Sequence, residues 1–151
     1  MHNHAPQNYT CPICLAAQAI ESDQTLILQQ DILYQDDDVM VFIASFFIQG
    51  AEGHLIVVPT KHFENLYELP DEIGAKIFKI AKEYSLKMKH AYGCSGVNLL
   101  QNNEPASGQH AFHYHLHLFP RYEGSDIWQN MEKKLLTSPE ERLAFVQKFN
   151  N

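Results

Sequence analysis

The chain has 151 residues, of which 45% are hydrophobic and 19% charged, and its formal net charge is −7 at pH 7. This length fits one domain with a single core, and no apolar run approaches the ~20 residues that cross a bilayer, so we expect neither a membrane span nor a signal peptide. The negative charge excludes a broad nucleic-acid surface, because such a surface needs many Lys and Arg side chains. Any anionic substrate must therefore be held locally.

The chain begins with a segment, residues 1–10, that has no hydrophobic periodicity and that we interpret as a flexible arm. Residues 11–151 are interpreted as a single domain. Cys11-Pro12-Ile13-Cys14 follows the arm and leads into a short helical stretch ending near Ile20, with both thiols at its beginning. The third cysteine, Cys94, leaves an odd count, which makes a disulfide framework unexpected and favours a reducing cytoplasm.

The next part of the chain predicts three strands. Ile32–Gln35 and Val39–Ile43 flank the acidic turn Asp36-Asp37-Asp38, a pattern typical of a β-hairpin. The three aspartates are interpreted as a solvated turn, with a metal site as the alternative. Gly53 to Pro59 is nearly all apolar and predicts a central strand, followed by a turn and a short helical segment at Phe63 to Leu69.

The second half predicts two helices and two strands. Pro70-Asp71-Glu72 opens the longest helix, which Gly93 ends. A strand at about Gly96 to Gln101 and a polar loop lead into a histidine-rich strand, and a final helix begins near Ser138. Strands in runs with helices between them predict an α+β domain with an antiparallel sheet, one long helix and shorter terminal helices.

The histidine-rich strand spans Phe112 to Arg121. Because side chains alternate along a strand, His113, His115 and His117 share one face. Neutral imidazoles near pH 7 can attack phosphorus or accept a proton, but a row of histidines can also bind a catalytic metal. The Cys-x-x-Cys pair raises a second alternative, since its spacing lets both thiolates reach one zinc ion; the redox reading expects a βαβ context that this N-terminus lacks.

The row His113-Tyr114-His115-Leu116-His117 resembles the signature of the histidine triad (HIT) family of nucleotide hydrolases and transferases. The likeness covers about residues 10–122 and includes Gly53 to His62, Asn102 and Gly108-Gln109. It is closest to the bacterial zinc-containing branch. The resemblance implies a HIT-like fold, a homodimer, and a purine nucleotide substrate that is a nucleoside phosphoramidate or a dinucleoside polyphosphate.

The resemblance also implies a role for each site residue. His115 is the nucleophile that forms a nucleotidyl-histidine, assisted by His117, His54 and Gln109. Substrate contacts are implied for Asn102, Gln109, His110 and His117. A structural zinc ion is implied at Cys11, Cys14, His62 and His113.

Two positions depart from the family pattern. Ser45-Phe46-Phe47 stands where relatives carry an aspartate for the ribose, and His110 stands where they carry serine or threonine. We expect an altered substrate preference and retained activity. The alternatives to a hydrolase are a nucleotidyltransferase of the same superfamily, in which glutamine usually replaces the third histidine, and a purine-nucleotide-binding module without turnover. A further expectation, left open, is that Trp128 reaches the partner subunit.

Overall fold

The computed structural model describes residues 2–150. The helices are α1 (Pro12–Ala17), α2 (Asp71–Tyr92) and α3 (Pro139–Gln147), with short 3-10 turns η1 (Gln29–Asp31), η2 (Pro105–Ser107) and η3 (Trp128–Asn130). The strands are β1 (Ile32–Gln35), β2 (Val39–Ile43), β3 (Phe46–Phe47), β4 (Leu55–Pro59), β5 (Gly96–Gln101), β6 (Leu116–Arg121) and β7 (Leu135–Leu136).

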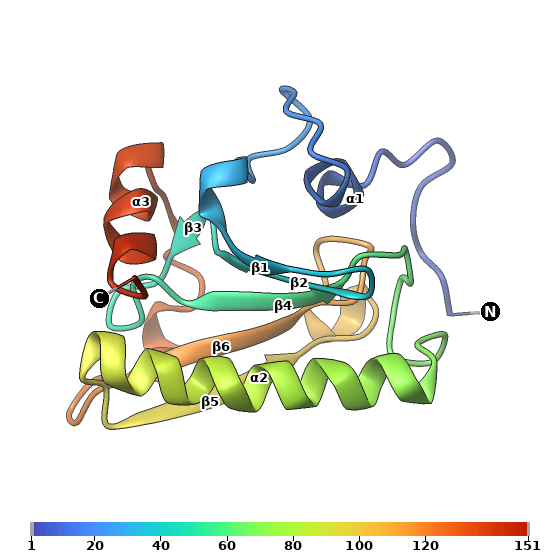
Figure 1. The fold of residues 1–151 in the computed structure, drawn as a ribbon. Coiled ribbons are helices and arrows are strands. Elements are labelled where there is room, and N and C mark those ends of the chain that lie inside the picture. The colour runs from blue at the N-terminus through green and yellow to red at the C-terminus, as the bar shows by residue number, and fades with distance from the viewer. Residues whose placement is uncertain (1, 151) are drawn as a thin grey trace.

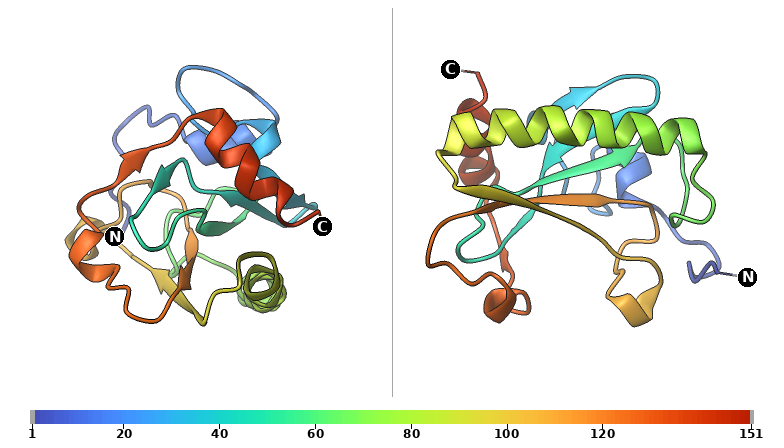
Figure 2. Two further views of the ribbon diagram at one scale, coloured as in Figure 1. Left: turned by 90° about the vertical axis from the view of Figure 1, so that its left-hand side faces the viewer. Right: turned by 90° about the horizontal axis from the view of Figure 1, so that it is seen from below.

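A five-stranded antiparallel sheet in the order β1-β2-β4-β6-β5 forms the centre of the molecule. Helix α2 runs along one face of this sheet, while α1 and the short pair β3-β7 lie on the other side (Figures 1 and 2). The predicted α+β class with an antiparallel sheet and one long helix is confirmed.

Successive side chains along the strands point to opposite faces of the sheet, and the two faces differ in what they contact. Val41, Leu55 and Leu118 point toward α2 and pack against its buried stripe in the main core. Their neighbours Phe42, Ile56 and His117 point to the opposite face. The helix face therefore supplies the main hydrophobic core, and the opposite face is available for a binding site.

Helix α2 has the ends that its sequence predicts. Asp71 and Glu72 lie in its first turn, where negative charge complements the helix dipole. Gly93 ends it with φ 65°, a left-handed conformation in which a Cβ would be strained, and its N–H bonds to Lys89 O. Ile77, Ala81 and Met88 are fully buried against the sheet, so the stripe is core.

The short helix expected at Phe63 to Leu69 is absent; residues 66–68 form a turn, with bends at residues 65 and 69. Side chains take the backbone N–H groups that a helix would use: Asn103 Oδ1 accepts from Leu66 N at 2.8 Å, and Asn65 Oδ1 accepts from Tyr67 N at 3.0 Å. Local side-chain acceptors of this kind compete with helix formation.

The histidine-rich strand is shorter than expected, because β6 begins only at Leu116. Pro59 lies at the end of the neighbouring strand and has no N–H to extend the ladder. Instead, His113 Nε2 bonds to Pro59 O at 2.9 Å and Tyr114 N donates to Phe63 O at 2.6 Å. His113 and His115 therefore precede the strand, and only His117 lies within it.

The C-terminal segment is tied back to the sheet by α3. Ser138 and Glu141 form a capping box at the start of this helix. Arg142 is buried, lies 3.0 Å from Asp31 Oδ2, and donates to Thr137 O at 2.8 Å and Leu26 O at 3.1 Å. One guanidinium thus joins α3, η1 and the strand-like segment around β7.

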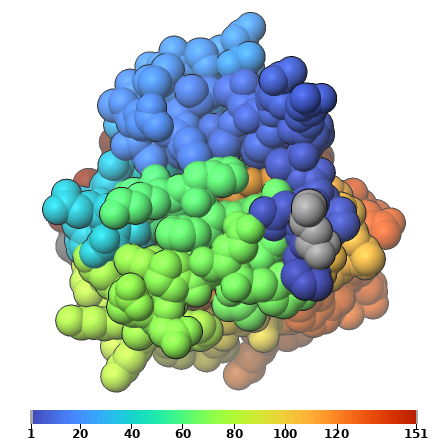
Figure 3. Space-filling view, turned by 90° about the vertical axis from the view of Figure 1, so that its right-hand side faces the viewer, coloured from blue at the N-terminus to red at the C-terminus, as the bar shows by residue number. Residues whose placement is uncertain are grey.

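The segment before Cys11, expected to be a flexible arm, makes specific contacts. The Glu64 side chain accepts from His4 N, and His4 Nε2 lies 2.9 Å from Glu104 Oε2. Figure 3 shows this dark blue segment lying against green residues near position 65. Across residues 2–150, no helix is both long and apolar enough to span a membrane.

Candidate functional site

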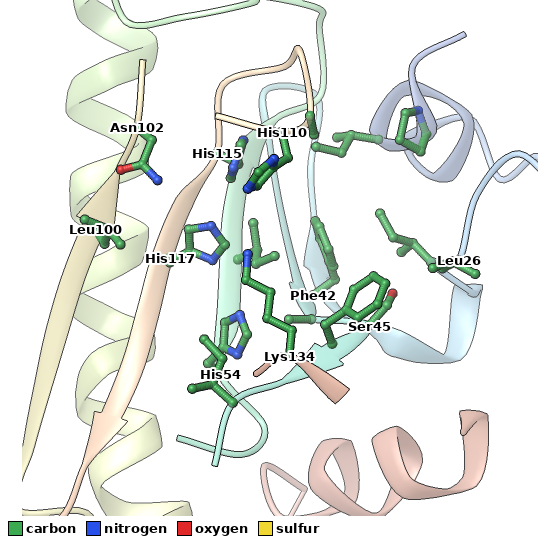
Figure 4. Close-up of a pocket in the computed structure, with 18 of the residues that line it drawn as sticks. Leu26, Phe42, Ser45, His54, Leu100, Asn102, His110, His115, His117 and Lys134 are labelled. Atoms are coloured by element: carbon green, nitrogen blue, oxygen red, sulfur yellow. The ribbon is translucent and has the colours of Figure 1, made fainter. Parts of the chain in front are cut away.

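A cavity of about 380 Å³ lies on the sheet face opposite α2. Its floor is one row of paired residues that crosses four strands, in which Phe42 pairs with Ile56, Ile56 with His117, and His117 with Leu100. The side chains of paired residues lie on the same face of a sheet. The floor of the cavity is therefore formed by the central sheet (Figure 4).

His115 lies at the wall of this cavity and is 8% exposed. Its Nδ1 lies 2.7 Å from the backbone oxygen of His113. A carbonyl oxygen only accepts, so Nδ1 carries the hydrogen and Nε2 keeps its lone pair. Burial lowers the pKa of His115, which favours the neutral ring.

His117 and His54 complete the imidazole cluster. The ring centroids of His115 and His117 are 5.0 Å apart, and those of His54 and His117 are 5.4 Å apart. Burial lowers the pKa of His54 to about 3 and that of His117 well below its usual value. The Nδ1 atoms of both rings are buried and make no hydrogen bond among the described residues. Each is therefore an unpaired polar atom beside the cavity, shielded from solvent in this conformation.

The other end of the cavity is apolar. Leu26, Ile27, Phe42 and Ile48 line it, and Ser45 supplies a hydroxyl group there. In Figure 4, Leu26 and Ser45 lie on one side of the histidines and Asn102 on the other. The site thus joins a hydrophobic end, which can pack against an aromatic ring system, to a polar end lined by imidazoles.

Some residues of the loop before the histidines line the cavity, and others hold the loop in place. Asn102 and His110 line the cavity, as the resemblance implies. Gln109 does not line it: its amide nitrogen donates to Glu64 O at 2.6 Å and Ala111 O at 3.1 Å, and its oxygen accepts from Glu104 N at 2.7 Å. Gln109 holds the loop in this structure, and its expected catalytic role stays a prediction.

Lys134 also lines the cavity and was missed by the sequence reasoning. It lies in the irregular segment between η3 and β7, and its positive charge contributes to the lowered pKa of both His54 and His117. No local motif marks this residue, because only the path of the C-terminal segment brings it to the histidines.

A cluster of two cysteines and two histidines lies at the N-terminal end of α1. The Sγ atoms of Cys11 and Cys14 and one ring nitrogen each of His62 and His113 lie within 4.8 Å of one another. Cys11 Sγ is 3.3 Å from His113 Nδ1, and Cys14 Sγ is 3.4 Å from His62 Nδ1. The structure thus brings all four predicted metal-binding residues together.

The donor set of this cluster fits zinc. Zinc bound to sulfur at about 2.3 Å and nitrogen at about 2.0 Å in a tetrahedron places the two ligands roughly 3.6 Å apart, close to the distances seen here. His113 Nε2 donates to Pro59 O, which leaves Nδ1 with a lone pair facing the thiols. The hydrogen bond from the Cys14 thiol lowers the pKa of the Cys11 thiol, which favours a thiolate at Cys11, and the same contact raises the pKa of Cys14.

Comparison with known proteins identifies the family. The HIT domain model matches residues 27–124, well over half of the chain. The chain belongs to the HIT domain family. Among HIT relatives, protein hit of Bacillus subtilis is 35% identical over 101 residues, covering 64% of this chain and 68% of the relative. The adenylylsulfatase HINT3 of Arabidopsis thaliana is 32% identical over 96 residues, covering 64% of this chain and 48% of the relative.

Solved HIT structures share the fold. A Hit-like protein of Bartonella henselae involved in cell-cycle regulation has a TM-score of 0.80 at 26% identity and covers 97% of both chains. A zinc-bound histidine triad protein of Mycobacterium smegmatis has a TM-score of 0.72 at 19% identity, covering 93% of this chain and 94% of that one. The chain is thus related to nucleotide hydrolases of the HIT family.

Proposed function

We propose that this HIT protein is a hydrolase that cleaves nucleoside phosphoramidates or dinucleoside polyphosphates through a nucleotidyl intermediate on His115. The observation that carries the proposal is the bond from His115 Nδ1 to His113 O, because it leaves a neutral Nε2 lone pair beside two other histidines in the cavity. A binding module without turnover needs no such oriented nucleophile.

The reaction has two displacements. His115 Nε2 forms a bond to the α-phosphorus while the bond from phosphorus to the leaving group breaks and its electron pair goes to the leaving group. A phosphate leaves as the oxyanion, whereas the nitrogen of a phosphoramidate takes up a proton from solvent and leaves as the neutral amine. The ring becomes cationic, and its Nδ1–H already points at a carbonyl oxygen that stabilises this charge. Water then attacks phosphorus, the bond to Nε2 breaks, and a nucleoside monophosphate and a proton leave. His117 and His54 hold the phosphoryl oxygens through their ring nitrogens.

The shape of the cavity supports a purine nucleotide as the substrate. The base would lie against Phe42, Ile27 and Leu26, with the phosphate at the imidazoles and Asn102. An apolar slot of this kind rewards a large ring system. The presence of His117, where transferases of the superfamily usually have glutamine, favours water as the acceptor.

We also propose a zinc ion at Cys11, Cys14, His62 and His113. The distances and proton positions described above support it, as does the zinc-bound relative from Mycobacterium smegmatis. When bound, the ion supplies a structural cross-link between α1, the loop after β4 and the residue that orients His115. It takes no part in the chemistry at phosphorus.

We further propose that the protein works as a homodimer in a reducing cytoplasm. Strand β5 is an edge of the sheet, and Leu99 on it is 44% exposed, which suits pairing with a second copy. The three cysteines are free thiols. Analytical ultracentrifugation at micromolar concentration tests the dimer, and a monomer at all concentrations contradicts it.

The test of the proposed reaction is capture of the intermediate. Protein mixed with adenosine phosphoramidate is quenched at alkaline pH, where a phosphorus–nitrogen bond on histidine survives, and digested for mass spectrometry. We expect an adenylyl group on His115. Steady turnover with no adduct at any quench time would show that water attacks the substrate directly. His90→Gln, on the exposed face of α2, is a control that should leave the adduct unchanged.

A further inference from the structure

The HIT cavity contains one fixed positive charge, that of Lys134. Among the residues that line it, none is acidic, and no other is Lys or Arg. Figure 4 shows the ammonium end of Lys134 directed toward His117. The protein as a whole carries a formal charge of −7, whereas the charge in the cavity is positive. A cation without a neighbouring carboxylate attracts an anionic ligand.

Lys134 has no ion-pair or hydrogen-bond partner within residues 2–150. Other lysines of the chain do: Lys76 pairs with Asp36 and Asp38, and Lys87 pairs with Glu83. Lys134 therefore keeps its charge available for a ligand.

The backbone around Lys134 is anchored on both sides. Asn130 Nδ2 donates to Gln49 O at 3.2 Å. Three residues after Lys134, Thr137 donates to Ser45 O from both N (3.1 Å) and Oγ1 (2.8 Å), and Thr137 O accepts from the buried Arg142. The lysine is thus carried by a fixed wall of the cavity, although its side chain is exposed.

The cavity needs this cation only for some of the substrates in the proposed function. A phosphoramidate carries one negative charge, at the phosphorus that is attacked, and its leaving group is an amine. A polyphosphate or another mixed anhydride adds the charges of its leaving group. His54 and His117 are held neutral by burial, so among the residues that line the cavity Lys134 alone offers a full positive charge to this added negative charge.

We infer that Lys134 binds the anionic leaving group, so that this site is built for nucleotides whose leaving group is itself a phosphate or a similar oxyanion. This inference rests on the proposed function and narrows its substrate class. Lys134 would stabilise the negative charge that grows on the bridging oxygen as the phosphorus–oxygen bond breaks.

The experiment compares two substrates in two variants. Diadenosine triphosphate has an anionic leaving group, and adenosine phosphoramidate does not. Lys134→Met keeps the length of the side chain and removes its charge, and we expect it to lower the ratio of kcat/KM for diadenosine triphosphate over that for the phosphoramidate by about tenfold or more. Lys133→Met, an exposed neighbour that does not line the cavity, should leave the ratio within about twofold.

A binding measurement separates this inference from the proposed function. If Lys134 binds the leaving group, Lys134→Met weakens binding of ADP to the His115→Ala protein by about tenfold while AMP binding changes less than about threefold. This result supports the inference even if the wild type turns over neither substrate, an outcome that would overturn only the hydrolase proposal. Equal losses for both substrates and both nucleotides, or no loss at all, would overturn the inference.

Discussion

The backbone oxygen of His113 accepts a hydrogen bond from the His115 imidazole over 2.7 Å, and the His113 ring lies 3.3 Å from the Cys11 thiol. One residue therefore faces the proposed metal with its side chain and orients the proposed nucleophile with its main chain. A change at the thiol cluster, such as loss of the metal, should alter the orientation of His115, although no cysteine lines the cavity. The prediction for Cys14→Ser below follows from this link.

Replacing His115 by alanine should reduce kcat/KM by at least about a thousandfold, because it removes the attacking nitrogen. Nucleotide binding should survive, since the cavity floor belongs to other residues. Steady-state assays and equilibrium titration with AMP check the two expectations. Activity within about tenfold of wild type would exclude His115 as the nucleophile.

Metal analysis should find one zinc ion per chain. Cys14→Ser should lose most of it and lower both the melting temperature and kcat, because the His113 carbonyl is then less well fixed. Cys94→Ala removes a buried thiol outside the cluster and should keep the metal. Protein purified without chelators that contains no metal and retains full activity would be incompatible with this assignment.

Acid should destabilise the protein in part through His54. Its folded-state pKa of about 3 lies below the ordinary value of 6.5, so the unfolded chain binds more protons between these two values. The stabilising contribution is fully present above about pH 6.5 and is lost as the pH falls toward about 3, which amounts to roughly 2 kcal/mol between about pH 7 and pH 5.

Denaturant unfolding of His54→Phe should show this loss directly. The variant should have a shallower fall of the free energy of unfolding over the same pH range, while His90→Gln, an exposed position on α2, should follow the wild type. Identical slopes for His54→Phe and the wild type would show that His54 is not held neutral in the folded state.

The buried pair of Arg142 and Asp31 should be worth more than the exposed pairs. Arg142→Met leaves the Asp31 carboxylate buried without a cation and frees the carbonyl groups of Thr137 and Leu26, so we expect a loss of about 3–5 kcal/mol in the free energy of unfolding. Glu83→Gln removes an exposed pair on α2 and should cost under about 1 kcal/mol. Similar values for both variants would refute the ranking.

Discrimination between ribose and deoxyribose should be weak. The resemblance implies a ribose-binding aspartate at the stretch Ser45-Phe46-Phe47, of which Ser45 and Phe46 line the cavity. The Ser45 hydroxyl would replace charged hydrogen bonds worth about 1.5–3 kcal/mol each with a weaker neutral contact. Ser45→Asp should increase the preference of kcat/KM for adenosine over 2′-deoxyadenosine phosphoramidate. A wild-type preference above about a hundredfold would mean that another residue holds the sugar.

The sheet and the long helix follow closely from sequence pattern. The ranges of β1, β2 and β5 agree with the predicted ones, because alternation, turn residues and Gly93 act locally and point to the same structure. The helix predicted at residues 63–69 is wrong because the side chains of Asn65 and Asn103 accept hydrogen bonds from backbone N–H groups of this segment. Asn103 lies far along the chain, so a local pattern could not show its contact.

The site divides in the same way. The histidine row and the Cys-x-x-Cys pair are visible as spacings, and they point to His115 and His117 and to a thiol site. The roles of His54, His62 and His113 are expected only from the resemblance to the HIT family. The orientation of Gln109 could not be anticipated, because it depends on the path of the loop around Glu64 and Glu104. Lys134 could not either, since the buried bond from Arg142 to Thr137 decides where its segment lies.

The family model covers residues 27–124, which include the proposed nucleophile His115, whereas Cys11, Cys14 and Lys134 lie outside it. If the proposed roles of His115 and Lys134 hold, attack and leaving-group selectivity are encoded in separate stretches of the gene. Exchange of the C-terminal stretch between relatives is a route to new leaving-group preferences that leaves the attacking atom untouched, and directed evolution of this scaffold should begin there.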